Sequence, residues 1–175
     1  QLDPGDPLSY VFFTDNAARG SNYGLEASLN WSVRPSLLLG ATLGLLESEY
    51  LDYQYGDRNL DGREQASAPP YQYSLSAEWT PRRGWMARAD VRGCASFYFD
   101  TSNDQRSNAY TLVNLKAGYE SGRWSVYAWG RNVFDEKYAV RGFYFGLEPP
   151  DFADKLYIQR GDPRLAGVTI TWSIR

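Results

Sequence analysis

Apolar and polar residues alternate along most of this chain, and this period of two limits the folds available to it. In the first clear stretch every second residue is apolar: Leu25, Ala27, Leu29, Trp31 and Val33. Successive side chains of a strand point to opposite faces, so the spacing predicts a strand with one apolar face. Comparable stretches bounded by turn residues predict about eight strands, the first of them the weakest: residues 8–13, 25–33, 37–50, 71–80, 85–92, 111–120, 124–132 and 168–175.

The composition excludes several classes of protein. The mean hydropathy is −0.53 and no apolar run approaches the roughly 18 residues of a membrane-spanning helix, which excludes a helical membrane protein. Hydrophobic residues make up 43% of the chain, too many for a disordered protein. The net charge of −3 offers no basic surface for nucleic acid. The chain has no histidine and a single cysteine, Cys94, so we expect neither an enzyme nor a bound cofactor.

The polar face of the predicted strands separates a soluble sandwich from a transmembrane barrel. Small and hydrogen-bonding residues dominate this face, with interspersed charges of both signs: Glu26, Glu78, Arg88, Asp90, Arg92, Lys116 and Glu120. The apolar face is almost free of charge. A barrel in a membrane needs apolar side chains toward the lipid and a polar lumen. We therefore predict an all-β fold, an antiparallel transmembrane β-barrel.

The connections between the predicted strands alternate between short and long. The short ones are residues 34–35, 81–84 and 121–123, and the long ones are residues 52–69, 100–108 and 133–164. Outer-membrane barrels have short periplasmic turns and longer extracellular loops. We therefore expect a protein of the outer membrane of a Gram-negative bacterium, with its long loops extracellular and its C-terminus periplasmic.

Five tryptophans lie within a few residues of a short connection or of the C-terminus, and all have the parity of the apolar face: Trp31, Trp79, Trp85, Trp124 and Trp172. Tryptophan is enriched at membrane–water interfaces, so we predict that these five form a membrane-interface girdle. Other aromatic residues cluster at the opposite strand ends and predict a second girdle with its loops: Tyr50, Tyr53, Tyr55, Tyr71, Phe97, Phe99 and Tyr110.

Four tracts resemble a known family: RGSNYGLE at 19–26, DGREQASAP at 61–69, WSVYAWGRNVFDEKY at 124–138, and GDPR at 161–164 before the last strand. Together they resemble the C-terminal part of a TonB-dependent outer-membrane receptor. Residues 132–138 and 161–164 are the most specific parts. The resemblance implies a 22-stranded barrel filled by an N-terminal plug domain. Such a receptor imports iron–siderophore complexes or a similar scarce nutrient with energy delivered through TonB.

On this resemblance, residues 1–175 are the C-terminal segment of the barrel, about eight of its 22 strands, and the plug domain lies outside them. The implied partners are outer-membrane lipid, the plug and remaining strands of the same receptor, the TonB complex, and a small-molecule ligand such as a ferric chelate. Members of the family end in an aromatic residue, whereas this chain ends in Arg175. We therefore expect at least one further residue in the native protein.

The long loops contain the residues that we predict to bind the ligand: Tyr53, Tyr55, Arg106, Arg141, Phe143, Tyr144 and Phe145. Aromatic rings interleaved with cations can hold a planar, anionic ferric chelate by stacking, cation–π and charge-assisted contacts. Alternatively, the aromatic side chains pack the loops against their neighbours.

One loop tract begins like a calcium-binding loop, with oxygen-bearing side chains at alternate positions: Asp57, Asn59 and Asp61. The glutamate that closes an EF-hand loop is missing, because Ala68 stands at its position. Aspartate, asparagine and glycine are also ordinary turn residues, so a solvated turn is the alternative.

The sequence leaves two other functions open. A complete eight-stranded barrel, acting as an adhesin or a structural protein, is compatible with 175 residues, but it would have to pair residues 8–13 with the last strand. A soluble β-barrel that binds a ligand would need the tryptophan-rich face as its core.

Overall fold

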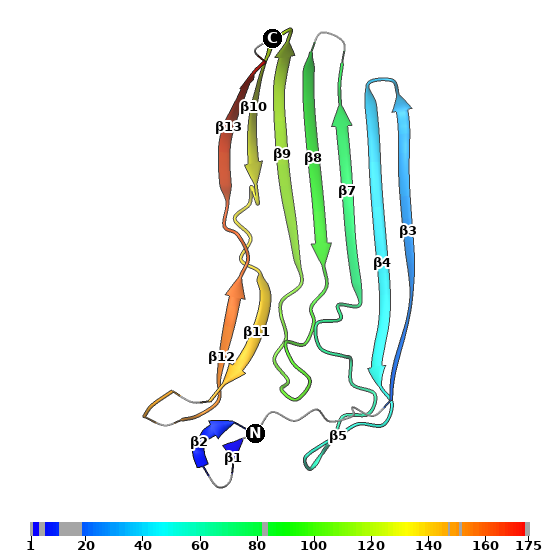
Figure 1. The fold of residues 1–175 in the computed structure, drawn as a ribbon. Coiled ribbons are helices and arrows are strands. Elements are labelled where there is room, and N and C mark those ends of the chain that lie inside the picture. Colours follow the sequence, from blue (N-terminus) through cyan, green and yellow to red (C-terminus); the bar gives the residue numbers. More distant parts are fainter. Residues whose placement is uncertain are drawn as a thin grey trace.

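Seven antiparallel strands form one sheet that runs the length of the molecule (Figure 1). This computed structural model describes residues 2–3, 6–10, 19–81, 84–146, 148–150 and 152–173. The strands of the sheet are β3 (Gly20–Arg34), β4 (Leu37–Tyr50), β7 (Tyr71–Trp79), β8 (Trp85–Cys94), β9 (Tyr110–Ser121), β10 (Trp124–Arg131) and β13 (Leu165–Trp172). Each of these seven strands pairs with the one that follows it in the list above, and the order across the sheet is β13-β10-β9-β8-β7-β4-β3. The strands β3 and β13 therefore lie at the two edges.

Three small hairpins lie outside this sheet. They are β1 (Leu2–Asp3) with β2 (Asp6–Tyr10), β5 (Gln54–Tyr55) with β6 (Arg58–Asn59), and β11 (Ala139–Phe145) with β12 (Lys155–Arg160). The β11–β12 hairpin prolongs the β10–β13 pair beyond the sheet (Figure 1). The two ends of the sheet differ: the short turns lie at one end, here called the turn end, and the long connections lie at the other, here called the loop end.

The structure confirms an antiparallel all-β fold and seven of the expected strands, and it corrects two predictions. Residues 8–10 belong to β2, which pairs with β1 and not with a described strand of the sheet, and residues 11–13 lie outside the described part. The segment 133–164 is not one open loop, because its middle forms β11 and β12. In both segments a strand pairs with a neighbour that is close in sequence. The weak alternation of residues 8–13 and 133–164 could not predict this pairing.

The register places like side chains in rows across the sheet. One apolar row runs through Leu29, Ala41, Leu75, Val91 and Val113. One polar row runs through Ser28, Thr42, Ser74 and Arg92, and the hydroxyl groups of Thr42 and Ser74 lie 2.7 Å apart. The sheet therefore has an apolar face and a polar face, as the alternation predicts.

No second layer covers the apolar face within the described residues. Leu25, Val168 and Ile170 are 60%, 64% and 71% exposed, although each belongs to that face. A soluble sandwich or barrel would bury these side chains, because their burial is the main force that folds such a protein. Among the described residues, the tryptophan-rich face is therefore not buried as a core.

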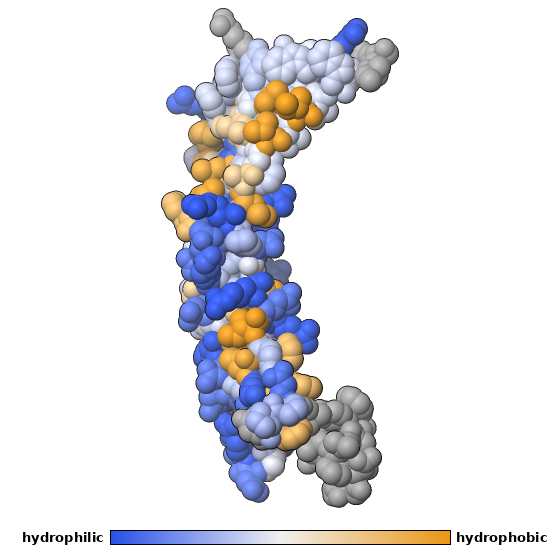
Figure 2. Space-filling model, turned by 90° about the vertical axis from the view of Figure 1, so that its left-hand side faces the viewer, coloured by the Kyte–Doolittle hydropathy of each residue, from blue (hydrophilic) through white to orange (hydrophobic). Residues whose placement is uncertain are grey.

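Hydropathy also changes along the strands. Seen from the side of β13, hydrophobic residues gather mainly toward the turn end, whereas hydrophilic residues predominate toward the loop end (Figure 2). In the part of the chain that the structure describes, no helix is long and apolar enough to cross a membrane.

Candidate functional site

A hollow of about 860 Å³ lies on the polar face toward the loop end. Side chains of five strands border it, among them Glu26, Gln72, Arg92 and Tyr110. Small residues such as Gly44 and Ser74 also line the hollow. The hollow thus lies on the polar face next to the long connections.

A small buried cluster closes the hollow at the loop end. Cys94, Phe97 and Phe99 form its centre, and Tyr110, Ala139 and Leu156 pack against them. The predicted second aromatic girdle is therefore wrong for Phe97, Phe99 and Tyr110. Cys94 and Tyr110 have the parity of the polar face, so the cluster lies on the inner side of the sheet. The alternation could not predict this buried cluster, because residues 95–109 lie outside the strands of the sheet and do not follow their period.

The β11–β12 hairpin packs against this cluster with one of its two faces. A Cβ atom at Gly142 would lie only 2.5 Å from the ring of Phe99, so this position has room for glycine alone. Leu156 shares this inner face and touches the cluster. The alternate residues of the hairpin consequently face outward.

Two long loops, residues 51–70 and 95–109, are joined around the ring of Tyr98. The guanidinium groups of Arg63 and Arg106 lie 4.0 and 4.3 Å from the centroid of that ring. The backbone carbonyl of Tyr98 also accepts a 2.9 Å hydrogen bond from the N–H of Ser67. Arg106 in addition pairs with Glu64 at 2.6 Å. We call Arg58, Arg63, Glu64, Tyr98, Asp104 and Arg106 the loop clasp.

Asp104 is the acidic centre of the loop clasp. Its carboxylate accepts from Arg63 at 2.5 Å and from Arg58 at 3.1 Å. The same two arginines donate to the backbone carbonyls of Asn103 and Ser102. The hydrogen bond from Arg63, followed by that from Arg58, holds the pKa of Asp104 below its usual range. Sequence analysis missed Arg58, Arg63, Tyr98 and Asp104, because their partners lie about forty positions away.

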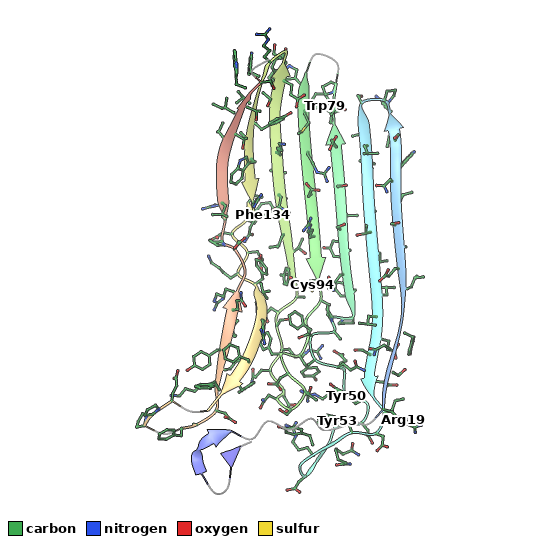
Figure 3. The ribbon with its side chains drawn as sticks, viewed as in Figure 1. Arg19, Tyr50, Tyr53, Trp79, Cys94 and Phe134 are labelled. Atoms are coloured by element: carbon green, nitrogen blue, oxygen red, sulfur yellow. The ribbon has the colours of Figure 1, made fainter. Side chains whose placement is uncertain are left out.

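The seven predicted ligand-binding residues do not form one surface. Tyr53 and Tyr55 belong to the tract of the β5–β6 hairpin, where the Tyr53 ring lies 4.9 Å from that of Tyr50 (Figure 3). Arg106 is part of the loop clasp and already pairs with Glu64. Whether the guanidinium group of Arg106 can contact a ligand therefore depends on its contacts within the loop clasp.

The remaining four candidates lie on opposite faces of β11. Tyr144 shares the inner face with Gly142, and its pKa is raised, first by burial and then by the nearby carboxylates of Asp100 and Asp104. Arg141, Phe143 and Phe145 lie on the outer face, where the Phe143 ring stacks on Tyr157 at 5.6 Å. Ligand contact at all seven positions stays a prediction, and only Tyr144 of these four faces the side of the hollow.

The calcium-like tract forms a capped turn. The side chain of Asn59 accepts a 2.8 Å hydrogen bond from the N–H of Asp61, and the Asp61 carboxylate accepts one of 2.7 Å from the N–H of Tyr53. Side-chain oxygens in such turns commonly bind the local backbone. Among the described residues, no three histidine, cysteine or acidic side chains gather in a way that could hold a metal ion.

Asn132 and Asp135 build the joint at which the β10–β13 pair passes into the β11–β12 hairpin. The Nδ2 of Asn132 donates to the carbonyls of Glu136 and Asp162, both at 3.0 Å, and its Oδ1 accepts from the N–H of Glu136 at 2.8 Å. Asp135 accepts from the N–H of Arg164 at 2.9 Å. Residues 132–138 and 161–164, the two tracts that resemble the family most specifically, thus contact each other at this joint.

The electrostatics of the joint agree with this geometry. The N–H of Arg164, and then the ammonium group of Lys137, keep the pKa of Asp135 below its usual value. Asn132 and Asp135 have φ angles of 46° and 55°. Asparagine and aspartate tolerate this left-handed conformation better than most residues, which suits them to the tight turn.

An ion-pair group occupies the polar face nearer the turn end. Arg88 on β8 pairs with Glu78 across the sheet at 2.9 Å and with Asp90 on its own strand at 2.8 Å. These contacts link Glu78, Arg88 and Asp90, three of the charged residues that the alternation assigns to the polar face, into one ion-pair group.

The five tryptophans of the predicted girdle all lie at the turn end of the apolar face. Trp79 is seen there in Figure 3, at the end of β7. All five are substantially exposed: Trp31, Trp79, Trp85, Trp124 and Trp172. Their role at a membrane interface stays a prediction.

The family assignment rests on the first three-quarters of the chain. The family described as "TonB dependent receptor-like, beta-barrel" matches residues 1–133, and the chain belongs to that family. This is a family of outer-membrane receptors.

Two solved structures share the fold. The ferric yersiniabactin uptake receptor FyuA from Yersinia pestis superposes with a TM-score of 0.74 at 21% identity, over 90% of this chain and 24% of its own. The siderophore receptor PiuA from Acinetobacter baumannii superposes with a TM-score of 0.69 at 15% identity, over 86% of this chain and 21% of its own. The chain therefore spans less than a quarter of the length of each receptor.

Proposed function

We propose that this chain is a C-terminal barrel segment of an outer-membrane receptor that imports an iron–siderophore complex or a similar scarce nutrient with energy from TonB. In this proposal the missing strands continue the sheet at its β3 and β13 edges toward a 22-stranded barrel. The plug domain then lies against the polar face. The long loops face the outside of the cell, and the turn end faces the periplasm.

One observation carries the proposal: a single-layer sheet leaves its apolar face uncovered and keeps ion pairs and polar rows on the other face. A sheet of this kind is stable where lipid covers the apolar face and a polar interior covers the other. The joint of Asn132 and Asp135 supports the proposal, because it unites the two tracts that resemble the family most specifically.

The inner surface at the loop end is the proposed ligand side. It combines the hollow, the loop clasp and Tyr144, which supply guanidinium groups, a phenol and aromatic rings. Such groups can bind an anionic chelate through charge-assisted and stacking contacts. The outer face of β11 with Phe143 and Phe145 is turned away from that side.

The test uses the complete receptor that contains this chain, in a strain deprived of iron. Deleting its gene should abolish uptake of at least one radiolabelled ferric chelate from a panel of catecholate, hydroxamate and mixed types. Disrupting TonB should abolish the same uptake, and complementation should restore it. Uptake that persists without TonB would contradict the energy source, and unchanged uptake of the whole panel would contradict iron import.

The two alternative functions have less support. A small eight-stranded barrel would need residues 8–13 beside the last strand, whereas β2 pairs with β1. A soluble binding protein would need the apolar face as a core, whereas that face is exposed in the described residues. Recovery of the protein from the aqueous phase without detergent would revive the soluble alternative.

A further inference from the structure

Arg92 supplies the hollow on the polar face with a positive charge. It lies on β8, two residues before Cys94, whose place at the loop end of that strand is seen in Figure 3. The residue is exposed and borders the hollow of about 860 Å³. In the part of the chain that the structure describes, its guanidinium group takes part in no ion pair, hydrogen bond or ring contact.

The acidic groups near Arg92 are engaged elsewhere or lie too far away. Asp90 is two residues away on the same face, but its carboxylate accepts three hydrogen bonds from Arg88, of 3.2, 2.9 and 2.8 Å. Arg88 also donates to Glu78 at 2.9 Å. Glu26 borders the hollow from β3, three strand spacings or about 14 Å from β8. Arg92 therefore keeps its donors for a group that enters the hollow.

Hydroxyl groups continue the row of Arg92 across the sheet. The residues aligned with it on the three successive strands toward the β3 edge all border the hollow: Ser74, Thr42 and Ser28. The hydroxyls of Thr42 and Ser74 lie 2.7 Å apart, so whichever of the two accepts keeps its own O–H free to donate. The row thus offers a cationic donor, followed by groups that both donate and accept.

The aromatic rings of the hollow contact one another. Tyr110 and Tyr138 border the hollow with ring centroids 4.6 Å apart, and Tyr110 also packs against the buried cluster of Cys94. The partner of Arg92 on β9 is Leu112, which bounds the row on that side with an apolar side chain. A ligand beside Arg92 therefore meets the hydroxyl row on one side and no free aromatic ring among its partners in register.

We propose that Arg92 recognises a carboxylate group of the imported chelate, with further oxygen atoms of the chelate along the hydroxyl row. Because the chelate is the one imported by the receptor proposed above, this assignment rests on that proposed function. A carboxylate matches the planar fork of a guanidinium group through two parallel hydrogen bonds, which the opposite charges strengthen. Arg92 thus selects ferric chelates that carry carboxylates over neutral hydroxamates and catecholates.

The experiment measures equilibrium binding of radiolabelled ferric chelates to the purified complete receptor. Two probes carry carboxylates, ferric dicitrate and a mixed phenolate–carboxylate chelate. Two probes lack them, a neutral ferric trihydroxamate and a ferric tricatecholate. A probe with a carboxylate should bind most tightly. The variant Arg92→Gln should weaken its binding about tenfold or more, because a charge-assisted pair of hydrogen bonds is lost.

Two further variants separate charge, geometry and position. Arg92→Lys keeps the charge without the planar fork and should recover part of the affinity. Arg131→Gln is the matched control, because Arg131 lies outside the lining of the hollow and its guanidinium group lies 5.4 Å from the ring of Trp129. It removes the same charge from the polar face and should change binding by less than about twofold.

Three results would overturn the proposal. The first is tightest binding of a probe that lacks a carboxylate, and the second is equal affinity of wild type and Arg92→Gln. The third is faster hydrogen exchange of the plug in ligand-free Arg92→Gln with ligand affinity unchanged, which would assign the partner carboxylate to the plug. Failure of cells to take up any chelate through the receptor would instead refute the proposed function, so the two failures are distinguishable.

Discussion

The side-chain amide of Asn132 donates a 3.0 Å hydrogen bond to the backbone carbonyl of Asp162, thirty residues further along the chain. This contact fixes the point at which the β10–β13 pair ends and the β11–β12 hairpin begins. Asn132 is buried and also bonds both the N–H and the carbonyl of Glu136. The joint is therefore a rigid connection between the sheet and a loop hairpin.

Replacing Asn132 by alanine should destabilise the receptor by about 1–3 kcal/mol, because the backbone carbonyls of Glu136 and Asp162 lose the donor that this buried side chain supplies. Asn132→Gly should not restore stability, since glycine accepts the positive φ but supplies no amide. Urea unfolding of the complete receptor measures the loss. Asn22→Ala, which removes one exposed 3.3 Å hydrogen bond to Gln65, is the control and should cost less than half as much. Equal losses would contradict the role of the joint.

Gly161→Ala should also destabilise the joint, because the added Cβ would overlap the ring of Tyr138. Overpacking of this kind costs about 1–3 kcal/mol. Gly44→Ala is the matched control, since its Cβ would meet only the carbonyl of Gln72 at 3.9 Å. Thermal unfolding compares the two variants, and a melting temperature of Gly161→Ala equal to that of the control would contradict the expected overlap.

Acid should open the loop clasp. The folded-state pKa of Asp104 is lowered by Arg63 and Arg58, so its contribution is fully present above the pKa of the unfolded chain. It is lost as the pH falls through the lowered folded-state pKa. Hydrogen exchange of residues 51–70 should therefore accelerate in acid beyond its intrinsic pH dependence. Asp104→Asn should show fast exchange already at pH 7, whereas the control Asp57→Asn should behave like the wild type.

Arg88 and Glu78 should be energetically coupled across β7 and β8. Both side chains are more than a third exposed, so solvent screens the pair and limits the coupling to about 1 kcal/mol or less. A double-mutant cycle with Arg88→Met and Glu78→Gln measures this coupling in the complete receptor. The coupling should shrink at high salt, and a value that does not depend on salt would point to packing in place of charge.

Tyr144 and Phe143 should differ in their effect on ligand binding, although they are neighbours in the chain. Tyr144→Ala should weaken uptake of the cognate ligand at least fivefold, because Tyr144 lies on the inner face of β11. Phe143→Ala should change it less than twofold, because Phe143 stacks on Tyr157 on the outer face. The reverse order of effects would place the ligand on the outer side of the hairpin.

The period-two pattern determined the strands of the sheet and their faces without help from the tertiary structure. On β3, for example, the alternate residues Leu25, Ala27, Leu29 and Trp31 pair with Leu45, Leu43, Ala41 and Leu39 of β4, so they lie in the apolar rows that their parity predicts. Parity suffices because the two faces of a strand meet different surroundings, and a shift by one residue would exchange them. The family tracts likewise identified the class of protein, which the family match confirms.

Only the tertiary structure decided how the loops are arranged. Arg63, Tyr98 and Asp104 meet across about forty residues, and Phe97 and Phe99 turn inward to a buried cluster where sequence analysis expected a membrane-facing girdle. Loop side chains follow no period, so their neighbours depend on where the backbone returns to the sheet. The predicted ligand residues were separated for the same reason: the sequence placed Arg141 to Phe145 in one long connection, and only the structure shows that they form β11 and, through the contact of Gly142 with Phe99, which face of β11 is the inner one.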